Sequence, residues 1–74
     1  MLIGVPKEVK AFENRVGLTP ASVREMIANR HEVVVETNAG HAIGFDDTDY
    51  EAAGARIAAE AEDVFAKAEM IVKV

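Results

Sequence analysis

Residues 18–35, LTPASVREMIANRHEVVV, carry the signals that decide the fold. Thr19-Pro20 predicts a helix start, because a threonine hydroxyl can accept a hydrogen bond from a free amide and proline suits the first helical position. Three apolar side chains then recur at the spacing of one helical face: Val23, Met26 and Ile27. The three valines at 33–35 are β-branched, which is typical of a buried strand. This stretch therefore predicts a helix followed by a strand.

An apolar run precedes this stretch, and a polar segment joins the two. Residues 2–5, Leu-Ile-Gly-Val, are apolar throughout and are followed by Pro6, which is typical of a strand covered on both faces. The thirteen residues 6–18 are many for a strand-to-helix connection, and loops of that length are often functional. The order strand, loop, helix, strand predicts parallel strands joined by a right-handed crossover.

The second half of the chain continues the alternation. A loop over residues 37–44 leads to a helix that we expect to begin at Asp46 or Asp47. Gly54 stands where this helix ends, and glycine there permits a left-handed backbone conformation. A short strand is then expected at residues 56–57.

A third helix over residues 60–66 and a last strand over residues 70–74 complete the pattern. Four apolar side chains form the predicted buried face of this helix: Ala61, Val64, Phe65 and Ala68. The fold class is therefore α/β, with an incomplete Rossmann-like parallel sheet and flanking helices. Because the chain stops inside the last predicted strand, we expect it to be part of a longer protein.

Composition argues against several classes of function. The net charge of −5 repels phosphate backbones, so we expect no nucleic-acid partner. The chain has no cysteine, which excludes disulfides and thiolate metal sites and fits a reducing compartment. No apolar run approaches the ~18 residues that span a bilayer, and the apolar start lacks the basic leader of a signal peptide. We therefore expect a cytoplasmic location and no membrane partner.

Arg15 is the strongest candidate for a functional residue. It belongs to the loop over residues 6–18 that leaves the carboxyl end of the first strand, where open α/β sheets bind ligands. A guanidinium holds a carboxylate through two parallel hydrogen bonds. The alternative is an internal ion pair in which Glu8 or Glu13 merely stiffens the loop. In the functional interpretation these two carboxylates orient Arg15 instead.

Other polar residues give weaker signals. His31 and His41 have no second histidine or cysteine at ligand spacing, so we predict no metal site. The acidic run at residues 46–49 lacks the glycine and the terminal glutamate of a calcium-binding loop, and helix capping explains it better. Residues 38–44 contain glycines at the wrong spacing for a dinucleotide fingerprint. We therefore expect no cofactor-binding residue within this chain.

The sequence resembles the amino-terminal part of alanine dehydrogenases and of the related alpha subunit of proton-translocating transhydrogenase. The resemblance rests first on GVPKEVKAFENRVGLTP, residues 4–20, which matches the family pattern G-[IV]-P-x-E-x-K-x-x-E-x-R-V-x-[LI]-T-P. Three further stretches match: HEVVVETNAG at 31–40, GFDDTDYEAAGARI at 44–57 and AEMIVKV at 68–74. The motif E-N-R-V in a lysine-containing loop favours alanine dehydrogenase over transhydrogenase.

This resemblance implies a function for the protein that contains the chain. Alanine dehydrogenases interconvert L-alanine and pyruvate plus ammonia with NAD, in a cleft between two Rossmann-like domains, and they form homo-oligomers. Residues 1–74 match the amino-terminal part of the substrate domain. In this family the arginine that matches Arg15 binds the substrate carboxylate. The family's second substrate-binding residue, a lysine, directly follows the strand V-K-V, so Lys73 is not that residue.

The family's catalytic histidine and aspartate, and its NAD-binding glycines, match positions beyond Val74. The resemblance thus implies that the remainder of the parent chain supplies the cofactor site, and that these 74 residues alone are inactive. Two alternatives stay open at this point. In the first alternative, the parent protein is the transhydrogenase alpha subunit. In the second, the chain is a non-catalytic α/β assembly module.

Two departures from the family pattern concern the backbone. Arg30 stands where the family often has a glycine before the strand, so we expect a different turn there or a left-handed Asn29. Asn38 replaces another family glycine, and asparagine tolerates the same left-handed conformation.

Overall fold

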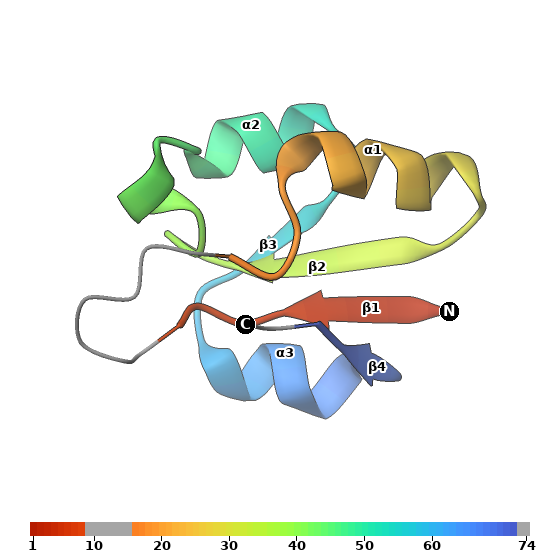
Figure 1. Ribbon diagram of the computed structural model, residues 1–74. Helices are drawn as coiled ribbons and strands as arrows, with labels where there is room; N and C mark the ends of the chain where they lie inside the picture. The colour runs from red at the N-terminus through yellow and green to blue at the C-terminus, as the bar shows by residue number, and fades with distance from the viewer. Residues whose placement is uncertain (9–15, 73–74) are drawn as a thin grey trace.

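The chain forms a four-stranded parallel sheet with helices on both faces (Figure 1). The computed structural model describes residues 1–8 and 16–72. The strands lie in the order β3-β2-β1-β4, and every neighbouring pair is parallel. Along the chain the elements are β1 (Leu2–Val5), α1 (Pro20–Ala28), β2 (Glu32–Glu36), η1 (His41–Ile43), α2 (Asp47–Ala52), β3 (Arg56–Ala58), α3 (Ala61–Lys67) and β4 (Met70–Ile71). This arrangement confirms the predicted fold class.

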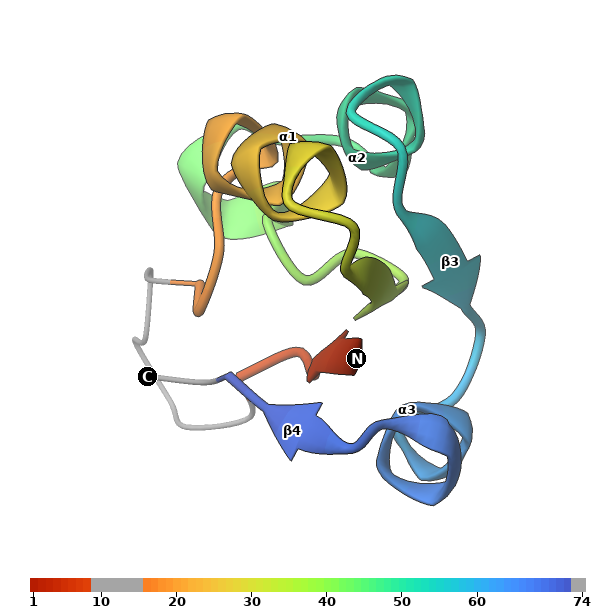
Figure 2. The ribbon, with the colours of Figure 1, turned by 90° about the vertical axis from the view of Figure 1, so that its right-hand side faces the viewer.

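The helices divide between the two faces of the sheet. Among the described helices, α1 and α2 lie together on one face and α3 lies on the other (Figure 2). A larger apolar cluster fills the space beneath α1 and α2, and a smaller one lies under α3. The consecutive valines of β2 serve both clusters, because Val33 and Val35 join the larger and Val34 the smaller. Because β2 is covered on both faces, its three middle positions are all apolar, and its two glutamates stand at its ends.

Close packing of α3 against β1 depends on Gly4. A Cβ atom at this position would lie 2.7 Å from the Cβ of Ala68 and 2.7 Å from the Cγ1 of Val64. Val64 is fully buried, and the strand must present a bare backbone to it. Gly4 thus sets the distance between the sheet and α3.

Most predicted element boundaries are confirmed. The Thr19 hydroxyl accepts a hydrogen bond from the Ser22 amide at 3.3 Å and so caps α1. Asp46, not Asp47, precedes α2, and its amide donates to the Asp49 carboxylate at 2.9 Å. Gly54 has a φ of 107°. Helix α3 begins one residue later than predicted, at Ala61, and ends at Lys67.

The turn after α1 differs from the prediction. Arg30 itself is left-handed, with a φ of 68°, whereas Asn29 has a φ of −90°. The Arg30 amide donates to the Ile27 carbonyl and the His31 amide donates to the Met26 carbonyl. These bonds close a Schellman-type helix end, which stabilises the left-handed residue despite its side chain. The expectation of a different turn or a left-handed Asn29 was therefore wrong.

The predicted buried face of α3 was partly wrong. Phe65 is 53% exposed, whereas its neighbour Val64 is fully buried against the sheet. Adjacent residues of an α-helix lie about 100° apart around its axis, so Phe65 points away from the strands. Strand β4 is described for Met70–Ile71, and the last two residues of the predicted strand lie outside the described part of the chain.

Candidate functional site

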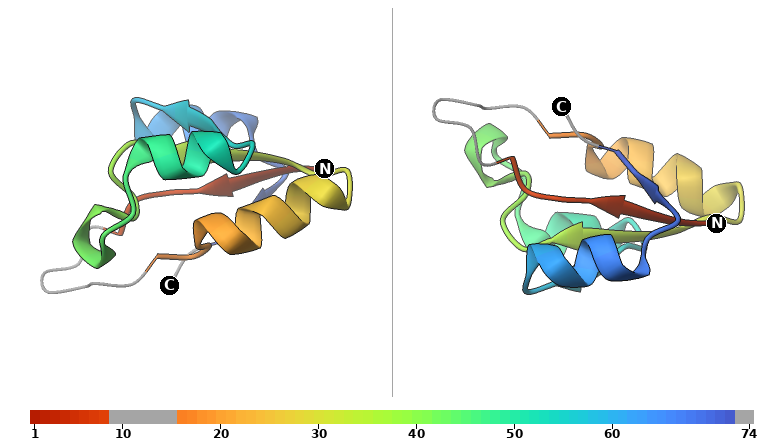
Figure 3. Two further views of the ribbon diagram at one scale, coloured as in Figure 1. Left: turned by 90° about the horizontal axis from the view of Figure 1, so that it is seen from above. Right: turned by 90° about the horizontal axis from the view of Figure 1, so that it is seen from below.

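The carboxyl ends of the four strands meet at one edge of the sheet, because all neighbouring strands are parallel. Figure 1 shows this edge on its left-hand side, where α1 and α2 begin and where η1 lies. Figure 3 shows from above and below that η1 and the end of β1 share this side of the molecule. Ligands of open α/β sheets bind beyond this edge, which makes it the candidate functional site.

The predicted site residues fall unequally within the described structure. Arg15 and Glu13 lie in residues 9–15, outside the described part, and Lys73 also lies outside it. Glu8 is described and half-buried, three residues after the end of β1. The residues on either side of this segment, 6–8 and 16–19, belong to the described part of the chain.

Glu36 holds the flank that leaves β1. Its Oε1 atom accepts a hydrogen bond from the backbone amide of Lys7 at 2.8 Å. Pro6, the residue between β1 and Lys7, is buried and has no amide hydrogen to donate. Glu36 is the last residue of β2, and its carbonyl accepts a hydrogen bond from Ala39 at 3.1 Å. The side chain of Glu36 thus accepts the amide hydrogen at the point where the pairing of β1 with β2 ends.

Tyr50 holds the flank that enters α1. Its phenol donates a hydrogen bond to the Leu18 carbonyl at 2.9 Å across 32 residues of sequence. The side chain of Tyr50 is fully buried, and its ring meets Phe45 edge-on at 6.4 Å between centroids. A Cβ atom at Gly40 would lie 2.6 Å from the phenol oxygen, so this glycine leaves room for the hydroxyl. Leu18 and Val16 also pack against the larger apolar cluster.

Asp47 fixes the turn that follows β2. Its carboxylate accepts hydrogen bonds from the Thr37 hydroxyl and from the Asn38 amide, the latter at 2.8 Å. Asn38 has a φ of 64°, as the substitution of asparagine for a family glycine suggested. The start of α2 and the end of β2 are thereby joined at the candidate site.

Burial raises the pKa of Tyr50 to about 12, and the nearby Asp49 carboxylate adds to this shift. Unfolded tyrosine ionises near pH 10, so the folded state keeps the phenol proton to higher pH. The contribution of the neutral Tyr50 phenol to folding stability is therefore complete below pH 10, and it is lost as the pH rises towards 12. We expect the unfolding midpoint of the full-length protein in urea to fall more steeply over this interval than that of a Tyr50→Phe variant. If the urea midpoints of the two proteins fell equally with pH over this interval, the raised pKa of Tyr50 would be contradicted.

The two histidines lie at opposite edges of the sheet, so they do not form an acid–base pair at the candidate site. His31 follows α1 at the opposite, amino edge of the sheet, and its buried Nδ1 atom has no hydrogen-bond partner among the described residues. His41 is exposed in η1. Within residues 1–8 and 16–72, no three acidic, histidine or cysteine side chains are arranged to hold a metal ion. No helix in this part of the chain is long and apolar enough to cross a membrane.

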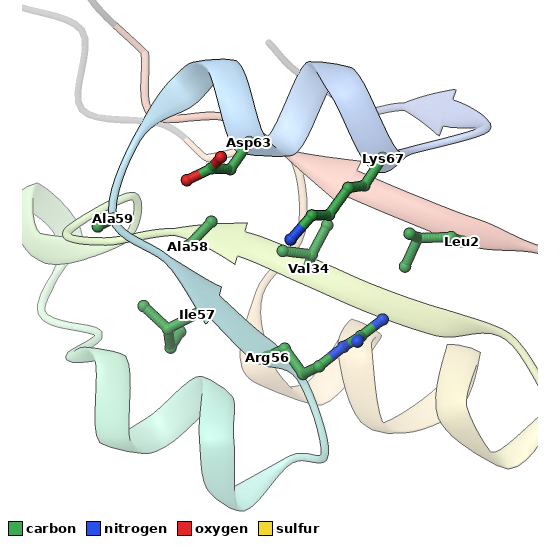
Figure 4. A pocket seen from close by; sticks show the side chains of 8 residues that line it. All are labelled: Leu2, Val34, Arg56, Ile57, Ala58, Ala59, Asp63 and Lys67. Atoms are coloured by element: carbon green, nitrogen blue, oxygen red, sulfur yellow. The ribbon is translucent and has the colours of Figure 1, made fainter.

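A separate pocket of about 200 Å³ lies on the α3 face of the sheet (Figure 4). Strands β2 and β3 form its floor, and α3 forms one wall. Arg56, Asp63 and Lys67 supply its charged groups. The pocket faces away from α1 and α2, so it is distinct from the two anchored flanks.

Sequence reasoning assigned no role to Glu36, Asp47 or the hydroxyl of Tyr50 in holding these loops. Two signals were present in the sequence. The apolar strand ends in a charged residue, Glu36. A charge beside buried positions usually has a hydrogen-bond partner, because burying an unpaired charge costs free energy. A buried tyrosine hydroxyl usually has a partner as well. The identity of each partner depended on which strand ends lie side by side, and that is a property of the folded chain.

Comparisons with known proteins place this geometry among characterised folds. The family model described as "Alanine dehydrogenase/PNT, N-terminal domain" matches residues 4–74. An alanine dehydrogenase of Bacillus subtilis (strain 168) is 54% identical over 74 residues, which are 100% of this chain and 19% of that protein. The chain therefore spans about a fifth of the length of this relative.

Solved structures agree with this match. A structure of L-alanine dehydrogenase has a TM-score of 0.95 and 51% sequence identity, and the match covers 99% of this chain and 20% of that chain. A transhydrogenase from Sinorhizobium meliloti has a TM-score of 0.85 and 33% identity, covering 99% of this chain and 21% of that one. Both proteins share the fold, and the alanine dehydrogenase is more similar in sequence.

Proposed function

This chain belongs to the family of alanine dehydrogenase/PNT N-terminal domains, and on that premise we propose that it is the amino-terminal part of the substrate domain of an NAD-dependent alanine dehydrogenase. The complete enzyme converts L-alanine, NAD and water into pyruvate, ammonia and NADH. The observation that carries this proposal is the 54% identity to an alanine dehydrogenase over the whole chain.

Within this function, Arg15 binds the carboxylate that alanine and pyruvate share. The two flanks of its segment are fastened at the carboxyl edge of the sheet by Glu36 and Tyr50, which is where an α/β sheet binds its ligands. A guanidinium in this place fixes the substrate through paired hydrogen bonds. Glu8 and Glu13 orient Arg15 in this proposal.

The remainder of the parent chain holds NAD in this proposal, since residues 38–44 lack the spacing of a dinucleotide fingerprint. NAD accepts the hydride from alanine. The chain's own part is to bind and orient the amino acid, so that the hydride moves over a fixed distance. We further propose that the enzyme is a homo-oligomer and that it is cytoplasmic. The absence of cysteine from this chain agrees with a reducing compartment.

The alternative parent is the alpha subunit of a transhydrogenase, because a transhydrogenase structure matches with a TM-score of 0.85. The two proposals differ in the molecule that exchanges hydride with the nicotinamide. An alanine dehydrogenase uses an amino acid, and a transhydrogenase uses a second nicotinamide nucleotide. The lower identity of 33%, against 51% for L-alanine dehydrogenase, favours the amino acid.

An assay of the purified full-length protein separates these functions. We expect NADH to form from NAD on addition of L-alanine, with no membrane fraction present, and to be consumed on addition of pyruvate and ammonium. L-Lactate in place of L-alanine serves as the control for a requirement for the amino group. Hydride exchange between two nicotinamide nucleotides without alanine turnover would instead support the transhydrogenase. Inactivity in both assays would favour the non-catalytic module.

A further inference from the structure

We propose that the pocket on the α3 face binds a free amino acid with an apolar side chain, at a site separate from the candidate functional site. This inference goes beyond the proposed function and does not rest on it. Every residue that lines the pocket belongs to the described part of the chain, and these residues come from β1, β2, β3, the residue after β3 and α3. The site is thus built by the sheet and the helix that covers it.

The size of the pocket limits its ligand. Its volume is about 200 Å³, whereas pockets for drug-sized molecules and cofactors hold roughly 300–1,000 Å³. Ala58 and Ala59 contribute small side chains to its lining, which leave this space open. A nucleotide is therefore too large for the pocket, and a single amino acid is of suitable size.

The floor of the pocket is apolar. Val34 of β2 and Ala58 of β3 are buried members of the smaller cluster, and Leu2 packs against them. Figure 4 shows these three side chains between α3 and the strands. An inorganic anion loses hydration over such a surface without gaining a partner from it. The floor therefore favours a ligand with a hydrocarbon part.

Charged side chains of both signs surround this floor. Arg56 of β3 and Lys67 of α3 supply two positive charges, and Asp63 of α3 supplies a negative charge. All three side chains are exposed, so a ligand in the pocket can reach them. Figure 4 shows Asp63 and Lys67 directed from α3 towards the strands, with Arg56 on the β3 side. A ligand that pairs with all of them carries a negative and a positive group.

The spacing of these charges fits a zwitterion. Asp63 and Lys67 stand one helical turn apart on the same side of α3, which is about 6 Å along its axis. The carboxylate of an amino acid can bind Arg56 through paired hydrogen bonds, beside the Lys67 ammonium. The ligand's own ammonium then binds Asp63. A dicarboxylate would instead place a like charge beside Asp63, and a simple amine would leave both cations without a partner.

L-Leucine is the probe for this site, and saturation-transfer NMR on the full-length protein measures its binding. Saturating pyruvate is present, so that the proposed substrate site is occupied. We expect a dissociation constant on the order of 1 mM, because so small a ligand makes few contacts. Arg56→Gln and Asp63→Asn should each weaken leucine binding about tenfold, as for the loss of one hydrogen bond between charged groups.

Two analogues of leucine assign the two charged ends of the ligand. Isocaproate lacks the ammonium, so its binding should respond to Arg56→Gln and not to Asp63→Asn. Isoamylamine lacks the carboxylate, so the opposite dependence is expected. Equal responses of both analogues to both variants would contradict the assignment of the two ends and, with it, the zwitterion site.

Glu62 and Arg24 provide matched controls. Glu62 is the neighbour of Asp63 in α3, and Arg24 is an exposed arginine of α1 on the other face of the sheet. Neither belongs to the lining of the pocket. Glu62→Gln and Arg24→Gln should therefore retain the wild-type affinity for leucine. A loss of affinity in these controls as large as in Arg56→Gln would show a general effect of surface charge and would overturn the site.

Two further results would overturn the inference. If Arg56→Gln and Asp63→Asn bind leucine as the wild type does, leucine binds elsewhere, and Asp63 and Lys67 form only an ordinary pair on the helix surface. If the wild-type protein does not bind leucine, another part of the parent chain fills the pocket. Neither result bears on alanine turnover, which is measured on the same samples, so the proposed function is tested separately.

Discussion

Replacing Arg15 by alanine in the full-length enzyme is expected to raise the KM for L-alanine and for pyruvate about 100-fold. The reason is that two hydrogen bonds to a charged carboxylate disappear together, and a bond of this kind contributes about 1.5–3 kcal/mol. Two such bonds at the lower limit amount to about 3 kcal/mol, and a factor of 100 corresponds to about 2.7 kcal/mol. The KM for NAD and NADH should stay near the wild-type value, because we place that site in another part of the protein.

Two further variants serve as comparisons for the KM of Arg15→Ala. Arg15→Lys keeps the positive charge but cannot reproduce the paired geometry, so its KM should fall between those of the wild type and the alanine variant. Arg24, an exposed arginine of α1, is the matched control, and Arg24→Ala should leave every KM unchanged. An Arg15→Ala enzyme with a wild-type KM for both alanine and pyruvate would show that Arg15 does not bind the substrate carboxylate.

The fold was predictable because local signals and burial agree. The Thr19-Pro20 cap, the apolar face of α1 and the valines of β2 all predict the elements that form. Once consecutive strands are joined by helices, the handedness of the crossovers allows few sheets. The observed order, β3-β2-β1-β4, is one of them.

The details that were wrong depend on tertiary contacts. Phe65 has the spacing of a buried residue next to Val64, and only the position of α3 over Gly4 decides which of them meets the sheet. Arg30 is left-handed because two amides at the helix end bond back to α1, which outweighs its side-chain preference. Neither outcome follows from the residue type alone.

For the candidate site, the sequence suggested one binding residue but not the side chains that support the neighbouring loops. The chemistry of a guanidinium and its place after a strand made Arg15 a candidate, and this role stays a prediction because the residue lies outside the described part of the chain. The supports, Glu36 and Tyr50, reach across 29 and 32 residues of sequence to their partners. Such contacts become visible only when the strand ends are placed side by side.

The largest effect on stability is expected at Tyr50, where one side chain joins the core to the entry of α1. Tyr50→Ala should destabilise the protein by about 3–5 kcal/mol, the usual cost of removing a large buried ring. Tyr50→Phe should lose about 1–2 kcal/mol, because only the bond to the Leu18 carbonyl disappears. Chemical denaturation of the full-length protein measures both differences.

The difference in unfolding free energy between Tyr50→Ala and Tyr50→Phe separates the contribution of the ring from that of the hydroxyl. The ring is fully buried and meets Phe45 edge-on, so it contributes packing that phenylalanine preserves. The hydroxyl serves the flank that leads to Arg15, so the phenylalanine variant should lose substrate affinity with little loss of fold. Equal destabilisation by phenylalanine and alanine would contradict this division, because it would mean that the hydrogen bond, and not the ring, holds α2 against the rest of the core.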